Sequence, residues 1–137
     1  LEIIQTGYSK NEELDFNKKY YFEFVSDVNQ YVIILLDTED DTDGSKGIIS
    51  DFTTKKFKSS KLRVSSKITL SEKSFILVQE FASISLADKF VDAYKAGFEF
   101  LDDLQDNIIY IITQENLKKL IETAKFEEYK LFYNDNY

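Results

Sequence analysis

The distribution of apolar residues along the chain predicts four β-strands. Residues 30–36 end in an unbroken apolar run, which is typical of a central strand buried on both faces. Residues 62–70 alternate over part of their length, residues 71–73 supply a turn, and residues 74–81 are again rich in apolar positions, so these two segments are expected to form a hairpin. A fourth buried strand is predicted over residues 107–112.

Helical spacing of apolar residues predicts the remaining elements. After an acidic, glycine-containing loop over residues 37–47, an amphipathic helix is expected from Ser45 onward. Ser85 is the predicted N-cap of a second helix, and Thr113 is the predicted N-cap of a third. The second helix would bury Leu86, Phe90, Ala93, Tyr94, Gly97 and Leu101, and the third would bury Leu117, Leu120 and Ile121. An aromatic stripe predicts a last helix near the C-terminal end.

The order of these elements is β-α-β-β-α-β followed by C-terminal helices. This order predicts an α+β fold of the ferredoxin-like, split β-α-β kind, with a four-stranded antiparallel sheet and two helices on one face. Residues 20–137 are expected to form this single domain. Its aromatic lead-in, residues 20–25, is interpreted as a short strand or an extended arm, and residues 1–19 as a linker or N-terminal extension.

Composition narrows the classes of function. The chain has 137 residues, of which 43% are hydrophobic, so it can bury a core, and no apolar run is long enough to cross a bilayer. A formal charge of −8 disfavours nucleic acid as a partner. Without His or Cys, the chain lacks the usual general base and the thiolate ligands. We therefore expect no enzyme activity, no cofactor and no metal site.

Two acidic clusters are the alternatives to that expectation. Glu39, Asp41, Asp43 and Gly44 resemble the start of a calcium-binding loop, but Ser50 stands where the bidentate Glu should be. A solvated loop is the simpler interpretation of this segment. Asp102, Asp103 and Asp106 are carboxylates in a polar turn, a pattern that is more often turn chemistry than catalysis.

Two surfaces are candidates for contact with another macromolecule. A basic cluster near the end of the first helix either neutralises the helix dipole or makes a charge-steered protein contact; it consists of Lys55, Lys56, Lys58, Lys61 and Arg63. The aromatic stripe near the C-terminal end is either a core face or a protein-contact face; it consists of Phe126, Tyr129, Phe132, Tyr133 and Tyr137.

The order of particular residues resembles a known family over residues 20–137. The shared features are the aromatic lead-in with Tyr20 and Phe22, the strand at 31–35, Ile49-Ser50-Asp51-Phe52, Leu62-Arg63-Val64-Ser65, the strand at 75–78, and Phe90-x-x-Ala93-Tyr94-Lys95. The most specific part is the capped turn at 111–117 followed by Glu128-Tyr129-x-x-Phe132-Tyr133-x-x-x-Tyr137. These features resemble the C-terminal module of the periplasmic tetratricopeptide-repeat lipoproteins of type IX secretion and gliding motility in Bacteroidetes (the SprE/PorW kind).

The resemblance implies a periplasmic, non-catalytic module, associated with the outer membrane through the rest of a longer lipoprotein. Its partners would be protein components of the secretion or gliding machinery. The acidic run at 37–43 departs from the family pattern, and no repeat helices precede the module here. A peptidoglycan- or small-ligand-binding envelope domain is the alternative function, with Tyr31 or Tyr110 on an exposed sheet face.

Overall fold

A computed structural model of the chain describes residues 21–36, 42–68, 74–97, 101, 104 and 107–137. These residues contain one antiparallel sheet with the strand order β2-β3-β1-β4. The strands are β1 (Gln30–Leu36), β2 (Arg63–Ile68), β3 (Ser74–Phe81) and β4 (Ile109–Thr113). The helices are α2 (Thr42–Lys56), α3 (Ile84–Lys95), α5 (Gln114–Thr123) and α6 (Phe126–Asn136), and a 3₁₀ turn, η1 (Lys58–Ser60), follows α2. The predicted α+β class and the four-stranded antiparallel sheet are confirmed.

Helices α2 and α3 cover one face of the sheet. Val32 and Ile34 of β1 point into this layer and are fully buried there. Aromatic rings join the two helices, because Phe52 of α2 meets Phe90 of α3 edge to face at 5.8 Å. This larger of the two clusters of buried residues carries much of the apolar burial that stabilises the domain.

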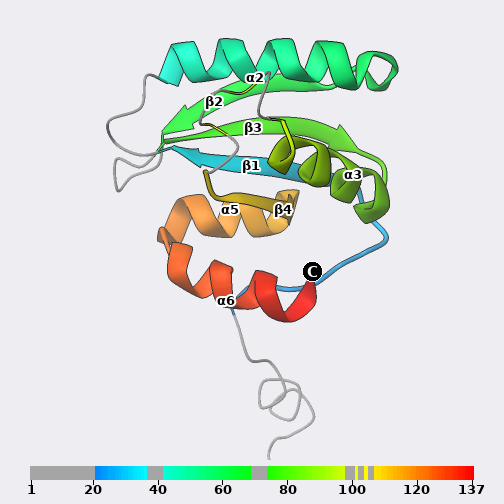
Figure 1. Cartoon of the computed structure of the whole chain (residues 1–137). Coiled ribbons are helices and arrows are strands. Elements are labelled where there is room, and N and C mark those ends of the chain that lie inside the picture. Colours follow the sequence, from blue (N-terminus) through cyan, green and yellow to red (C-terminus); the bar gives the residue numbers. More distant parts are fainter. Residues whose placement is uncertain (1–20, 37–41, 69–73, 98–100, 102–103, 105–106) are drawn as a thin grey trace, which may run out of the picture.

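Helices α5 and α6 cover much of the opposite face, so the domain has three layers (Figure 1). Ile33, between Val32 and Ile34 on β1, points into this second layer with Ile112 of β4. The alternation explains why β1 is apolar or aromatic from Tyr31 to Leu36, since helices pack against both of its faces. The sequence pattern predicted C-terminal helices but gave them no position; they form this second layer.

The lead-in segment is an extended arm and not a strand. Residues 23–26 have no regular secondary structure, yet Phe22 is buried and its ring meets that of Tyr129 edge to face at 4.9 Å. The Asn116 side chain replaces a strand partner: its Oδ1 accepts from the Glu23 amide at 3.1 Å, and its Nδ2 donates to the Glu23 carbonyl at 2.7 Å. The arm is therefore fixed to α5 and α6 by side chains.

A buried amide joins this arm to β1 and to the last residue. Gln30 has no exposed surface, and its Nε2 donates to the carbonyls of Val25 and Val28 at 3.1 and 3.0 Å. Its Oε1 accepts from the Tyr137 hydroxyl at 3.2 Å. The side-chain amide is thus satisfied inside the protein, as a buried polar group must be.

Several predicted boundaries are confirmed. The bounds of β1 and β3 match the predicted segments, and β2 pairs with β3 as the expected antiparallel hairpin. Thr113 caps α5, and its Oγ1 accepts from the Asn116 amide at 3.2 Å. Residues 1–20, the segment 37–41 and the turn at 71–73 lie outside the described residues.

Three local predictions are wrong. The loop expected up to residue 47 is helical from Thr42, because Ser45 and Ile49 bury one side of α2 despite the glycines. Ser83, not Ser85, caps α3 and accepts from the Leu86 amide at 3.2 Å. The predicted burial of Leu86 is also wrong: its side chain is 45% exposed, while Ala87 and Val91 join Phe90 in the core.

This register of α3 is testable by a matched pair of substitutions. Phe90→Ala should lower the free energy of unfolding by about 3–5 kcal/mol, because it removes a fully buried ring and leaves a cavity. Leu86→Ala should change it by less than about 0.5 kcal/mol, since that side chain lies at the surface. Chemical denaturation followed by circular dichroism measures both values. Equal losses would contradict the register.

Candidate functional site

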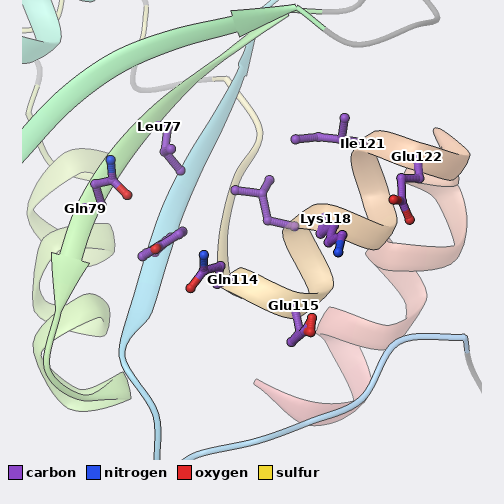
Figure 2. Close-up of a pocket in the computed structure, with 9 residues that line it drawn as sticks. Leu77, Gln79, Gln114, Glu115, Lys118, Ile121 and Glu122 are labelled. Carbon is purple, nitrogen blue, oxygen red and sulfur yellow. The ribbon is translucent and has the colours of Figure 1, made fainter.

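A groove lies between α5 and the part of the sheet that α5 and α6 leave open. It has a volume of about 760 Å³. Figure 2 shows Leu77 and Gln79 on β3 at one side and Gln114, Lys118 and Ile121 on α5 at the other. The complete lining is Tyr31, Leu77, Gln79, Gln114, Glu115, Leu117, Lys118, Ile121 and Glu122.

A second hollow of about 340 Å³ continues this groove toward the arm. Both hollows are lined by Tyr31, Gln114 and Glu115, so they meet at the half-buried Tyr31 ring. Glu80 and Asn29 also line the second hollow, where the Asn29 Nδ2 donates to the Glu80 Oε2 at 2.6 Å. We call the two hollows together the Tyr31 groove.

The Tyr31 groove combines an aromatic ring with amide and carboxylate groups. Gln79 and Gln114 offer both donors and acceptors, Glu115 and Glu122 offer acceptors, and Lys118 offers donors. Such a site can bind a polar ligand with a flat apolar face, in the way that small-molecule sites join apolar surface to a few polar groups. Sequence reasoning named Tyr31 but missed the two glutamines, which come together only through the position of α5 against the sheet.

The predicted basic cluster lies along the β2 edge of the sheet. Lys55 and Lys56 occupy the last turn of α2, Lys58 lies in η1, and Lys61 and Arg63 lead into β2. All five side chains are exposed. Residues 52–70 contain six of the 17 basic residues and none of the 25 acidic ones, which gives this stretch a formal charge of +6 and the rest of the chain −14. We call this surface the basic edge.

The aromatic stripe of α6 belongs mainly to the core. Tyr129 and Phe132 are 0% and 2% exposed, so their side chains are covered in this structure. Phe126, Tyr133 and Tyr137 are half-buried. Tyr129 and Phe132 therefore form part of a core face, which was one of the two interpretations of the stripe.

Tyrosines of α6 also close the β4 edge of the sheet. The Leu35 amide donates to the Ile108 carbonyl at 2.8 Å, so the alternation of an antiparallel pair turns the backbone of Ile111 away from β1. The Tyr129 hydroxyl donates to the Ile111 carbonyl at 2.6 Å. A hydrogen bond with the Ile111 backbone also contributes to the pKa of Tyr133. The outward carbonyl of this edge residue is therefore satisfied by a side chain of α6.

Other predicted acidic features do not form a site in the described residues. Asp43 is exposed in the first turn of α2, while residues 37–41 and the carboxylates Asp102, Asp103 and Asp106 lie outside the described part. Within the part of the chain that the structure describes, no group of three or more acidic residues is placed to hold a metal ion. No helix among the described residues is long and apolar enough to cross a membrane.

No family model, curated protein or solved structure matches this chain.

Burial of the tyrosine cluster predicts a loss of stability at high pH. Burial raises the pKa of Tyr133 and of Tyr137 from the ordinary 10 to about 12, and it also raises the pKa of Tyr129 well above 10. Because the folded pKa exceeds the unfolded one, the stabilising contribution is complete below about pH 10 and is lost as the pH rises toward 12.

We expect the melting temperature to fall between pH 10 and 12, and the fall to be smaller in the Tyr133→Phe variant, which has one ionisable ring fewer. Thermal unfolding by circular dichroism, with tyrosinate absorbance as a second readout, measures both. A variant that loses stability as steeply as the wild type would contradict this assignment.

Proposed function

We propose that this chain is a non-catalytic protein-interaction module. The observation that carries the proposal is the separation of charge, with a formal +6 over residues 52–70, which include the five exposed side chains of the basic edge, and −14 over the rest of the chain. A concentrated patch of one sign steers association and selects a partner of the opposite sign. The lack of His and Cys in the sequence is consistent with a binding role. The partner is a protein, because the overall charge of −8 opposes nucleic acid.

The setting we propose is a periplasmic cell-envelope assembly, with the type IX secretion and gliding machinery as the first candidate. Its support is the resemblance of the sequence pattern. Two parts of that pattern that are far apart in the chain are in contact: Phe22 of the aromatic lead-in packs against Tyr129 and Phe132 of the closing motif, with ring centroids 4.9 and 5.9 Å apart. In this chain, these two parts of the pattern therefore belong to one packed core.

We also propose that the sheet with α2 and α3 is a ferredoxin-like, split β-α-β unit. The chain order β1-α2-β2-β3-α3-β4 and the sheet order β2-β3-β1-β4 support it, because each helix connects two strands that have a third strand between them. Helices α5 and α6 would then be an addition that covers the second face.

A cross-linking pull-down from envelope extracts of the source organism tests the interaction role. The described domain, with residues 1–20 retained, should enrich outer-membrane secretion or motility proteins. The charge-reversed variant Lys58→Glu/Lys61→Glu/Arg63→Glu should lose this enrichment, because its basic edge becomes acidic. If the variant recovered the same proteins in the same amounts, the basic edge would have no part in the interaction.

The Tyr31 groove favours a second function, the binding of a peptidoglycan fragment or another small polar ligand. The half-buried ring of Tyr31 with Gln79 and Gln114 beside it is the specific observation. Tyr110, the other tyrosine considered for this role, is 8% exposed and packs against Tyr129 and Tyr133, so it offers no such platform.

Titration with soluble muropeptides, followed by nuclear magnetic resonance, tests this second function. Amide shifts should concentrate around Tyr31, and Tyr31→Ala should weaken binding by about two- to tenfold, since an aromatic stacking contact contributes about 0.5–1.5 kcal/mol. Leu131→Ala, which truncates an exposed side chain on α6, is the matched control and should leave binding unchanged. Shifts that persist in the Tyr31→Ala variant would place the ligand elsewhere.

A further inference from the structure

The backbone groups at the two edges of the sheet differ in their hydrogen-bond partners. At the β4 edge, the Tyr129 hydroxyl of α6 donates to the outward carbonyl of Ile111. At the other edge, no strand pairs with the outer side of β2 in the part of the chain that the structure describes. Arg63 is exposed and Val64, Ser65 and Ser66 are half-exposed along it. An edge strand of this kind presents backbone donors and acceptors that an extended polypeptide can pair with.

The same edge carries the positive charge of the protein. Lys58 and Lys61 lie immediately before β2, and Arg63 begins it. A partner segment that binds at this edge must therefore have an extended backbone, and it must be acidic. We propose that the outer edge of β2 binds an acidic, extended polypeptide segment of a partner as an additional strand. This proposal deepens the protein-interaction role and rests on it.

The alternating sides of β2 define the pattern of that segment. Arg63 lies opposite Gln79 in the sheet, so its side chain shares the face that carries the Tyr31 groove. Val64 lies opposite Val78 and packs against the core cluster beneath α2 and α3. An added strand should therefore alternate acidic residues on the Arg63 side with apolar residues on the Val64 side. Six residues of β2 correspond to a contact of about 20 Å.

A second copy of this chain and a nucleic acid are the two alternative partners for the β2 edge, and both fit it less well. Pairing of β2 with β2 of a second copy would bring Arg63 and the lysines of both copies together, and like charges opposite one another are destabilising. A nucleic acid would satisfy the lysines, but it has no backbone amides and carbonyls with which to continue the sheet. Both remain as outcomes of the test below.

The probe is a fluorescein-labelled, end-blocked octapeptide that alternates Glu and Val, and binding to the full chain is followed by fluorescence anisotropy. We expect saturable binding that weakens with salt and is at least about tenfold tighter than that of the matched Lys/Val peptide, because the basic edge attracts one and repels the other. The variant Lys58→Glu/Lys61→Glu/Arg63→Glu should lose about tenfold or more in affinity. Lys89→Glu/Lys95→Glu/Lys130→Glu makes the same change of charge at exposed positions on α3 and α6 and should have a much smaller effect.

Backbone pairing is tested separately by methylating the peptide and leaving the protein unchanged. Two Glu/Val peptides carry N-methyl groups on alternate residues, one on each edge of the extended chain. Only the peptide methylated on the edge that faces β2 should lose binding, by about tenfold or more, because its donors to β2 are gone. This comparison needs no protein variant, so it stands even if a charge-reversed variant fails to fold.

Three results would overturn the proposal. Equal affinity of both methylated peptides and of a thymidine octanucleotide would mean that the basic edge attracts anions without strand pairing. Dimerisation of the chain that excludes the peptide would mean that a second copy occupies the edge. Absence of peptide binding, combined with envelope partners that the charge-reversed variant fails to capture, would reject strand addition while leaving the interaction role intact.

Discussion

The pairing of β1 on both edges, with buried residues on both of its faces, is the constraint from which the rest of the structure follows. This strand has β3 on one side and β4 on the other, and its alternate residues enter two different cores. Because β1 carries apolar side chains on both faces, a layer of helices is needed above and below the sheet. The outer strands β2 and β4 each have one edge without a neighbouring strand in the described sheet, and the backbone groups of these edges need other partners.

The two edges of the sheet have different roles: the β4 edge is covered by the protein itself, and the β2 edge is the proposed binding surface. At β4, aromatic side chains of α6 cover the edge and add their rings to the second core, where Tyr110 meets Tyr133 at 4.9 Å. At β2, lysines and Arg63 surround a short strand with half-exposed positions. Lysines on an edge strand oppose pairing between identical copies. The same charges favour an acidic partner, so protection against self-association and selection of a partner have one physical cause.

Features that depend on residues close together in the chain were predictable from the sequence. Features that depend on contacts between distant segments were not. The apolar run of β1 and the Thr113 cap report local chemistry, and both agree with the structure. Ser83 and Ser85 are equally good caps, and only the burial of Ala87 and Val91 decides between them. The basic cluster was visible in the sequence, but its position on a sheet edge requires the strand order. Gln79 and Gln114 are 35 residues apart, and no local signal places them in one groove.

The arm has a consequence for how the domain can be divided. Phe22 is buried in the second core against Tyr129 and Phe132 of α6. Tyr21 adds a hydrogen bond from its amide to the Glu128 Oε2 at 2.7 Å. A fragment beginning at β1 would keep the whole sheet and all four described helices, yet it would expose the rings of Tyr129 and Phe132 to water. The smallest stable unit therefore begins upstream of Phe22. A protease that cut between the arm and β1 would allow Phe22 to leave the second core, although every strand would remain intact.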